Sequence, residues 1–339
     1  MNVVGLDLHK SYAQVAILDK ETGVLDDFRV DSSASGLESL VEMVEPGTRV
    51  ALEACSHWGW ALDLLQESGL DVVLSHPSKT KAIGSAKIKT DKIDARMLAC
   101  LLAADLLPEA HAATPQVREL RSYLRYRYGL VTMRTIAKNR VHAILAGYGL
   151  KCPTKDLFCA KGLKWLSSQK LRSLHREIVD GHLEIIDLLD RKVTEVDERI
   201  VPIAEQDSEA MIVDTVPGIG YYSALLIVAE IDGAERFASA KCLVSYAGLC
   251  PSTRSSGGKE WHGHITKAGS RYLRWILIEA AQKAAWPTSP LHWFYRSIAR
   301  RKGNNSAKAA VARKLLESIY QMLKTGKPFD VKVWTKPTG

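Results

Sequence analysis

The sequence predicts a protein of mixed α/β and α class, and three observations lead to this prediction. Short apolar segments at 2–8, 11–18, 24–31, 49–53 and 71–74 have the length of strands, and two amphipathic helices separate the last three. Residues 116–147 have the periodicity of one long helix. Residues 182–203 repeat apolar side chains at spacings of four and three, which is typical of a coiled coil. We therefore expect an α/β domain over 1–110, a basic helix with a coiled-coil hairpin over 111–205, and a mainly helical domain over 206–339.

The N-terminal elements follow the order βββαβαβ. The first three strands are close together in the sequence, which favours an antiparallel meander. The segment 49–53 follows a helix and is almost entirely apolar, so we expect it to lie parallel to its neighbours and to be buried on both faces. Another helix begins within Lys89-Thr90-Asp91-Lys92-Ile93-Asp94-Ala95-Arg96 and continues to Leu102.

Four acidic residues fall at special places in this pattern. Asp7 and Glu53 lie inside or at the end of apolar strands, where a carboxylate is costly unless it is paired or bound to a metal. If the two strands are neighbours, these acids converge at one sheet edge, and Asp91 and Asp94, on one face of a helix, can close over them. Four carboxylates in one place suit two Mg²⁺ ions, an arrangement that supports phosphoryl transfer. The alternative for Asp91 and Asp94 is a helix cap and a solvated side chain.

Charge is unevenly distributed along the chain, whose net charge is +8. Residues 1–110 carry 10 Lys and Arg against 17 Asp and Glu, whereas residues 118–172 carry 13 against 2. Residues 173–235 carry 4 against 15, and residues 236–339 carry 19 against 4. Two basic blocks of this size indicate a polyanionic partner, and nucleic acid is the first choice.

The long helix at 116–147 carries arginines with few nearby acids in the sequence. We expect phosphate contacts, rather than an ordinary solvated face, from Arg118, Arg121 and Arg125. The coiled-coil seam is predicted to consist of His182, Ile186, Leu189, Val193, Val196, Ile200 and Ile203. This seam could pair with the basic helix as an antiparallel hairpin within one chain, or it could form a contact between subunits.

The C-terminal region contains two segments suited to phosphate chemistry. Pro217-Gly218-Ile219-Gly220 before a helix resembles a helix-hairpin-helix element, whose backbone amides can face a phosphate, although a plain tight turn is equally compatible. A serine- and glycine-rich loop over 246–259 is followed by a second basic segment at 265–271. The cations of the loop and of this segment could orient a phosphodiester and stabilise its transition state. They are Arg254, Lys259, Lys267 and Arg271. A serine in such a loop needs activation to act as a nucleophile.

These motifs carry a resemblance that extends over nearly the whole chain. The order of strands and acids resembles the ribonuclease-H-like fold, in particular its RuvC-like branch with a DEDD set. Both halves also resemble the insertion-sequence 110 (DEDD) transposase family, which includes the pilin-gene DNA invertases. The similar segments are Gly5-Leu6-Asp7-Leu8-His9-Lys10, Leu52-Glu53-Ala54, Lys89 to Ala95, Pro217 to Gly220, Ala247-Gly248-Leu249, Ser256-Gly257 and Lys267-Ala268-Gly269. Cys55-Ser56, Cys250 and Ser252 depart from the family pattern without removing an expected catalytic group.

The resemblance implies a site-specific DNA recombinase with a defined set of groups. Asp7, Glu53, Asp91 and Asp94 would hold Mg²⁺, and Ser256 would attack DNA to form a phosphoserine intermediate, with the adjacent Ser255 as the alternative. The resemblance further implies a homo-oligomer, a dimer or a tetramer on DNA, in which the acids of one subunit meet the serine of another. It also implies a guide RNA encoded by the element itself.

Other functions compete with this interpretation. One is a metal-only junction nuclease in which Ser256 is structural, and another is a DNA invertase of the same family. A non-catalytic nucleic-acid-binding protein is disfavoured because four unmetallated acids would repel DNA, and a sugar-kinase-like ATPase lacks a second phosphate loop. No apolar run is long enough for a bilayer, so we expect no membrane partner and a cytoplasmic, nucleoid-associated protein. The six cysteines are expected to be reduced and mostly buried.

Overall fold

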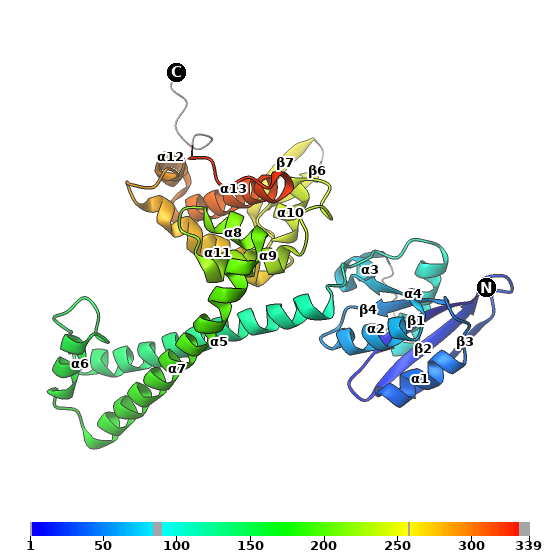
Figure 1. Ribbon diagram of the computed structural model, residues 1–339, viewed down its shortest axis with the longest axis horizontal. Helices are drawn as coiled ribbons and strands as arrows, with labels where there is room; N and C mark the ends of the chain where they lie inside the picture. Colours follow the sequence, from blue (N-terminus) through cyan, green and yellow to red (C-terminus); the bar gives the residue numbers. More distant parts are fainter. Residues whose placement is uncertain (1, 84–89, 257, 332–339) are drawn as a thin grey trace. The chain divides into compact units, whose positions relative to one another are not determined.

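The computed structural model describes residues 2–83, 90–256 and 258–331. The chain forms two compact units, here called the N-terminal unit (Met1–Gln116) and the C-terminal unit (Val117–Gly339). The first unit is α/β and the second is almost entirely helical (Figure 1). Among the helices of the described segments, none has the length and apolar character needed to cross a membrane. The division into three domains stays a prediction.

A five-stranded sheet with the order β3-β2-β1-β4-β5 forms the centre of the N-terminal unit. The strands are β1 (Asn2–Leu8), β2 (Tyr12–Asp19), β3 (Leu25–Asp31), β4 (Arg49–Glu53) and β5 (Asp71–Ser75). β1, β2 and β3 pair antiparallel, while β4 pairs parallel with both β1 and β5. The predicted meander is confirmed, and so is a parallel β4 whose three central residues are buried.

Helices cover both faces of this sheet. The helices are α1 (Ala34–Glu42), α2 (Trp58–Glu67), α3 (Pro77–Ile83), which was not expected, and α4 (Asp91–Ala103). α1 and α2 pack on the face that carries Leu6 of β1. α4 packs on the opposite face, where Leu98 and Leu102 contact Ala51 of β4.

Gly5 allows α4 to lie directly on β1. A Cβ atom at Gly5 would collide with the carbonyl oxygen of Ala95 and would lie 2.6 Å from the amide nitrogen of Ala99. No side chain fits between the two backbones, so only glycine permits this close approach. The register of α4 on the sheet is therefore fixed at this point.

The C-terminal unit begins with a long helical hairpin. It consists of α5 (Pro115–Gly147), the short α6 (Ala160–Ser167) near the tip, and α7 (Ser173–Gln206). Arg127 and Arg134 of α5 form ion pairs with Asp197 and Asp190 of α7, respectively. Moving seven residues forward in α5 corresponds to moving seven residues back in α7, so the two helices are antiparallel. The predicted hairpin within one chain is confirmed (Figure 1).

The buried face of α7 follows the predicted seam except at its two ends. Ile186, Leu189, Val193, Val196 and Ile200 are buried, but His182 is only half-buried. Ile203 is 41% exposed, and Ala204 is buried in its place. A straight α-helix drifts relative to a strict seven-residue repeat, so the contact face moves from position 203 to position 204.

The remaining helices pack together into one core. They are α8 (Ser208–Asp214), α9 (Tyr221–Ile231), α10 (Ala240–Tyr246), α11 (Arg271–Gln282), the 3₁₀ turn η1 (Lys283–Ala285), α12 (His292–Lys302) and α13 (Asn304–Thr325). The segment Pro217-Gly218-Ile219-Gly220 forms the turn between α8 and α9, as a helix-hairpin-helix-like element requires. Phosphate binding at this turn stays a prediction.

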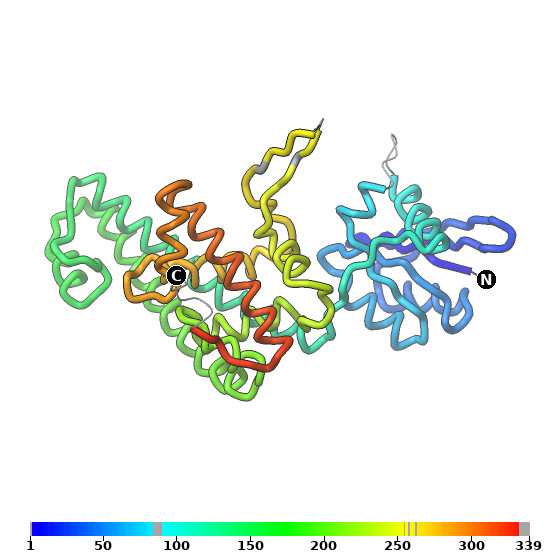
Figure 2. The backbone as a smooth tube through the Cα atoms, turned by 90° about the horizontal axis from the view of Figure 1, so that it is seen from above, coloured from blue at the N-terminus to red at the C-terminus, as the bar shows by residue number. Residues whose placement is uncertain are grey.

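Two expectations about the C-terminal unit and the cysteines are wrong. The segment interpreted as a serine-rich loop forms a two-stranded hairpin of β6 (Pro251–Ser256) and β7 (Lys259–Ile265), which extends from the helices of its unit (Figure 2). The six cysteines are free, but none is fully buried: three are exposed and three are half-buried. A thiol is small and only weakly polar, so its partial exposure at helix and loop positions costs little free energy.

The end of the predicted seam offers a matched pair of substitutions. Ile200→Ala should lower the free energy of unfolding of the C-terminal unit by about 2–5 kcal/mol, because a fully buried side chain leaves a cavity. Ile203→Ala removes the same atoms from an exposed site and should change it by less than about 0.5 kcal/mol. Urea unfolding followed by circular dichroism measures both, and equal losses would contradict the observed register.

Candidate active site

The packing of α4 on β1 places acidic side chains over the carboxyl end of β1. Asp7 lies two residues beyond Gly5 and therefore on the same face of the sheet. Asp91 lies one helical turn before Ala95, which contacts Gly5. Two residues of strand and one turn of helix span similar distances, so the contact between Gly5 and Ala95 brings Asp7 and Asp91 together.

Asp7, His9 and Asp91 form a compact cluster, in which one ligand atom from each residue lies within 4.8 Å of the others. His9 Nε2 is 3.1 Å from Asp7 Oδ2 and 3.5 Å from Asp91 Oδ1. Tyr12 donates its hydroxyl to the other oxygen of Asp91, Oδ2, at 2.6 Å. This hydrogen bond is the largest of the effects that raise the pKa of Tyr12, so the hydroxyl stays protonated as a donor. Asp91 is thus held on one side and offers Oδ1 to the cluster.

Glu53 and Asp94 come from β4 and α4, the two elements that pack next to Asp7. β1 and β4 are paired in parallel with Leu6 opposite Leu52, so Glu53 ends its strand at the level of Asp7. Glu53 shares its sheet face with Ala51, which is the face covered by α4. Asp94 is close enough to raise the pKa of Asp7. Among the described residues, however, the compact group contains only Asp7, His9 and Asp91.

The Asp7 carboxyl is held in an environment that disfavours its charge. Its residue is 8% exposed, and burial is the main reason that its pKa is raised. Asp94 and Asp91 raise this pKa further by repulsion, while His9 lowers it. A divalent cation would remove this repulsion, because its charge is opposite to that of all these carboxylates.

Two cations hold the start of α4 against β3. Arg96 donates two hydrogen bonds to Asp27, at 2.7 and 2.8 Å, and Lys92 lies 2.9 Å from the same carboxylate. The hydrogen bonds from Arg96 are the largest cause of a pKa of about 2 at Asp27. Arg96 and Lys92 belong to the helix turns that also carry Asp91 and Asp94. Asp27 therefore fixes the position of the acids without joining them.

The residues present fit a hard divalent cation. Two carboxylates and one imidazole supply oxygen and nitrogen donors, and no thiol is a member of the described cluster. Burial and the neighbouring acids raise the pKa of Asp7. Such a raised pKa is typical of a cation site in which no cation compensates the negative charge of the carboxylates. The sequence analysis missed His9, although an Asp-x-His pattern places both side chains on one side of an extended chain.

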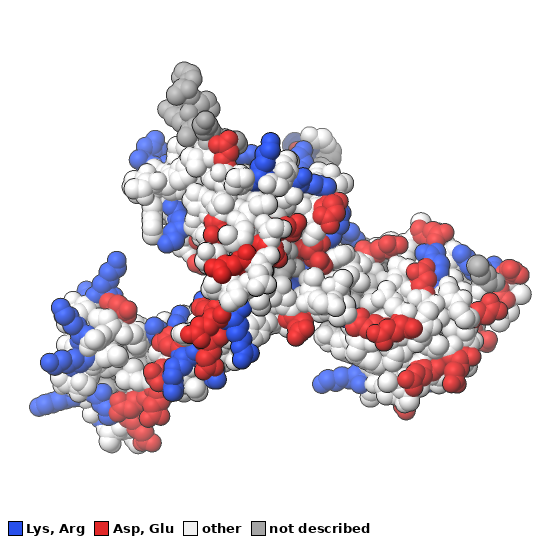
Figure 3. Space-filling view, in the orientation of Figure 1, with Lys and Arg blue, Asp and Glu red and all other residues white. Residues whose placement is uncertain are grey.

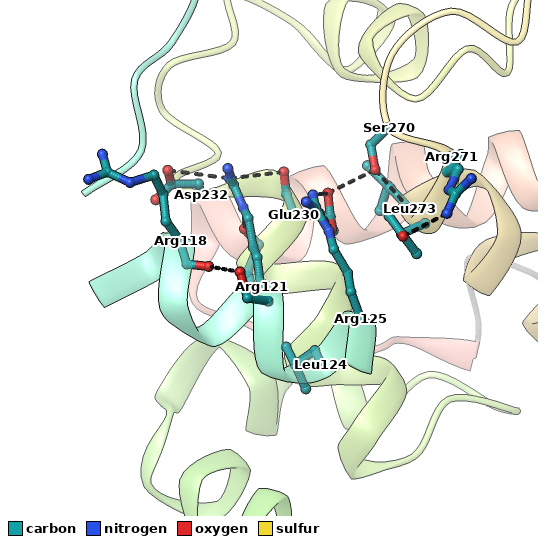
Figure 4. A network of polar contacts seen from close by, with 12 residues as sticks. Arg118, Arg121, Leu124, Arg125, Glu230, Asp232, Ser270, Arg271 and Leu273 are labelled. Atoms are coloured by element: carbon teal, nitrogen blue, oxygen red, sulfur yellow. Dashed lines mark hydrogen bonds and ion pairs between the residues drawn. The ribbon is translucent and has the colours of Figure 1, made fainter. Parts of the chain in front are cut away.

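The expectation that the α5 arginines lack acidic partners is wrong. Arg125 binds Glu230, which is only 1% exposed, through hydrogen bonds of 2.8 and 3.0 Å (Figure 4). Arg121 donates to the backbone oxygen of Ala229 at 2.6 Å and lies 3.4 Å from Asp232. The acids come from α9 and the residue after it, far away in the sequence, so local charge counting could not find them. Arg121 and Arg125 thus hold α5 to the rest of the unit.

The same network reaches the segment that precedes α11. Ser270 donates its hydroxyl to Glu230 Oε2 at 2.8 Å and accepts a hydrogen bond from the amide of Leu273, which caps α11 (Figure 4). Arg271 is exposed and lies over the ring of Tyr272, which also contacts Arg125. Arg118 is half-buried and also has partners within the protein. Glu230 therefore fixes the backbone from which Arg271 projects.

Ser256 is exposed at the end of β6, beside the turn of the hairpin. It pairs with Lys259 across the hairpin, whereas Ser255 pairs with Glu260. Directly opposite residues share a face and successive residues alternate, so Ser256 and Lys259 lie on one face and Ser255 and Glu260 on the other. The face of Ser256 suits an anionic phosphate better than the face of Ser255, which carries a carboxylate.

Two glycine motifs meet at the base of this hairpin. Gly248 and Gly269 both have positive φ, 66° and 74°, which glycine adopts without strain. A Cβ atom at Gly248 would collide with Ala268, and one at Gly269 would collide with Tyr246. The segments Ala247-Gly248-Leu249 and Lys267-Ala268-Gly269 therefore pack backbone against backbone. Lys267, itself at a φ of 57°, is exposed next to this contact.

One predicted site residue and two motif residues fall partly or wholly outside the described structure. The side chain of Arg254 is not among the described parts, although its backbone pairs with that of Trp261. Lys89 and Gly257, which belong to the sequence motifs, also lie outside the described residues.

An acidic cluster at a sheet edge and an exposed serine in a basic helical unit point to an enzyme that acts on phosphodiesters. Residues 4–150 match a family described as transposase, of the IS110 DEDD type, and residues 210–296 match the transposase IS116/IS110/IS902 family. The chain belongs to this IS110/IS116/IS902 family of transposases, which catalyse DNA cleavage and strand transfer.

Similar proteins carry related names. The transposase for insertion sequence element IS1111A of Coxiella burnetii is 25% identical over 95% of this chain and 90% of its own length. The transposase for insertion sequence element IS1328 of Yersinia enterocolitica is 23% identical over 97% of this chain and 99% of its own length. The pilin gene-inverting protein of Moraxella bovis is 28% identical over 42% of this chain and 46% of its own length.

The raised pKa of Asp7 predicts a specific pH dependence in the presence of a chelator. The unfolded chain loses the Asp7 proton near the ordinary pKa of 3.8, and the folded protein loses it at a higher pH, so the folded state binds more protons between the two pKa values. Stability must then fall as pH rises through this window. Asp7→Asn has no such titration, so its melting temperature relative to the unaltered protein should increase from pH 4 upward. A difference that does not change with pH would contradict the inferred burial.

Asp27→Asn is the matched control for this measurement. The pKa of Asp27 is lowered to about 2 from an ordinary 3.8, so its stabilising effect is complete above pH 4 and is lost as pH falls toward 2. The advantage of the unaltered protein over Asp27→Asn should therefore shrink below pH 4. The stability difference from the unaltered protein therefore changes below pH 4 for Asp27→Asn and above pH 4 for Asp7→Asn. The Asp27 carboxyl stabilises the unaltered protein as pH rises, whereas the Asp7 carboxyl destabilises it.

Proposed function

We propose that this protein is a site-specific DNA recombinase of an insertion sequence, which cleaves DNA through Ser256 with the help of Mg²⁺ bound by the N-terminal unit. The observation that carries this proposal is the convergence of Asp7, His9 and Asp91 at the end of β1. The strand order β3-β2-β1-β4-β5, with acids at the ends of β1 and β4, supports a ribonuclease-H-like, RuvC-like fold for this unit.

The proposed metal ligands are the four predicted acids together with His9. Asp7 and Asp91 would bind directly, and Glu53 and Asp94 would complete the charge of the site. When bound, Mg²⁺ supplies electrostatic stabilisation for the oxygens of a reacting phosphodiester. Tyr12 and His9 orient Asp91 from its two sides, and Asp27 holds the helix that carries it.

The proposed nucleophile is the hydroxyl of Ser256. Its attack on phosphorus forms the bond from Oγ to phosphorus and releases a 3′ or 5′ deoxyribose oxygen, which takes a proton. The hydroxyl proton leaves at the same time, and a second DNA strand reverses the reaction by displacing the serine. Lys259, on the same hairpin face, would bind the phosphate charge, and Lys267, Arg271, Arg254 and Arg118 would contact the neighbouring backbone.

The basic tip of the helical hairpin supports a further contact with nucleic acid. With Arg121, Arg125, Arg127 and Arg134 paired to acids, the exposed positive charge of this block lies around α6 (Figure 3). Its exposed members are Arg140, in the last turns of α5, and Lys151, Lys155, Lys161, Lys164, Lys170 and Arg172. This tip could bind DNA or the guide RNA that the sequence resemblance implies, because both present the same phosphate backbone.

An exposed apolar stripe on α7 supports a homo-oligomer. Leu174, Ile178, Ile185 and Leu188 are 47–71% exposed, and they lie on a different face from the buried seam. Their spacings of four, seven and three residues match a second coiled-coil seam. A dimer formed through this stripe would bring two sets of acids and two serines to the same DNA.

A covalent trapping experiment tests the proposed chemistry. The protein is incubated with Mg²⁺, DNA that spans the element ends, and RNA transcribed from the flanking non-coding sequence. We expect a denaturation-resistant protein–DNA adduct whose yield falls at least about a thousandfold in Ser256→Ala and strongly in Asp7→Asn. Ser255→Ala is the matched control and should retain the adduct, because Ser255 lies on the opposite hairpin face.

The pattern of adducts separates the competing functions. DNA cleavage without an adduct, unaffected by Ser256→Ala but abolished by Asp7→Asn, would instead identify a metal-only nuclease. Mixing Asp7→Asn with Ser256→Ala protein adds a test of the oligomer. Recovery of the adduct on the Asp7→Asn subunit would show that the acids act on a serine of another subunit, and no recovery would place both groups in one subunit.

A further inference from the structure

We propose that Trp261 stacks on a DNA base adjacent to the phosphodiester that Ser256 attacks. This inference rests on the proposed function. It assigns a role to a residue that belongs neither to the acidic cluster nor to the proposed nucleophile. Trp261 belongs to β7, in the hairpin that carries Ser256 (Figure 2).

The register of the hairpin places the indole and the serine on one face. Ser256 pairs with Lys259, and Trp261 lies two residues further along the same strand as Lys259. Alternate residues of a strand share a face, so Ser256, Lys259 and Trp261 form one row. A diagonal neighbour in an antiparallel pair is about 7–8 Å away, within reach of an aromatic side chain.

Nothing in the described part of the hairpin gives the indole a structural task. Trp261 is 55% exposed, although an indole usually contributes to stability by being buried. A two-stranded hairpin is marginally stable by itself, and such a hairpin gains little from an aromatic side chain that faces water. The exposed indole is therefore available to a partner outside the folded chain.

The chemistry of this face selects DNA as the occupant. Lys259 supplies a positive charge for a phosphate, and the hydroxyl of Ser256 can reach the same group. An aromatic plane next to a phosphate site can accept the base of the adjoining nucleotide, because every base has a π-face. Stacking there would fix the scissile phosphate relative to Ser256, so Trp261 is a positioning residue.

Photo-crosslinking tests this assignment directly. DNA spanning the element ends is made with 5-iodouracil at single positions on either side of the phosphate at which the covalent adduct forms. After irradiation of the complex with the unaltered protein, mass spectrometry should map the crosslink to Trp261 at one of these positions. Trp261→Ala should lose this crosslink and slow adduct formation at least tenfold, while Trp261→Phe, which keeps an aromatic plane, should recover part of the rate.

Trp286→Ala is the matched control, because Trp286 is exposed to a similar extent, 56%, but belongs to a different segment. It should leave the crosslink and the adduct rate unchanged. A normal adduct with a crosslink that maps elsewhere, or an unchanged rate in Trp261→Ala, would overturn the inference while leaving the proposed function intact. Dissociation of an oligomer by Trp261→Ala would also overturn it, since the indole would then contact another subunit. If the unaltered protein forms no adduct, the proposed function fails and this inference fails with it.

Discussion

The close contact between α4 and β1 determines the chemistry of the N-terminal unit. Gly5 lets the backbone of Ala95 lie on the strand, and this contact sets Asp91 next to Asp7. The resulting proximity is unfavourable by itself, because like charges repel and burial disfavours the charge of Asp7. Arg96 and Lys92 hold the helix in place through Asp27, outside the cluster. The fold thus keeps an electrostatic strain that a cation would relieve.

The C-terminal unit uses its charges in two different ways. Buried or partly buried arginines of α5 pair with acids and assemble the unit, as the contact between Arg125 and Glu230 illustrates. Exposed cations remain at the tip of the helical hairpin and next to Ser256. Breaking a buried pair leaves an uncompensated charge and destabilises the protein, whereas losing an exposed cation mainly weakens phosphate binding. Net charge alone does not separate these roles.

The sequence predicts the strands and the antiparallel meander because both depend on local patterns. Apolar runs define the strands, and a carboxylate at the end of such a run has few explanations besides a paired or metal-binding role. Other features depend on contacts between distant segments. The partners of Arg121 and Arg125 lie more than 100 residues away. His9 joins the cluster only because α4 brings Asp91 to it, and the hairpin around Ser256 was hidden by a composition typical of loops.

A titration with Mg²⁺ and Mn²⁺ followed by thermal unfolding tests the central claim, that the cluster of Asp7, His9 and Asp91 is a cation site. The unaltered protein should gain thermal stability as the metal concentration rises, because binding to the folded state alone shifts the unfolding equilibrium. Asp7→Asn should lose most of this gain, and Tyr12→Phe, which removes one hydrogen bond that orients Asp91, should lose part of it. Equal stabilisation of the unaltered protein and Asp7→Asn would contradict the account, because the metal would then bind elsewhere.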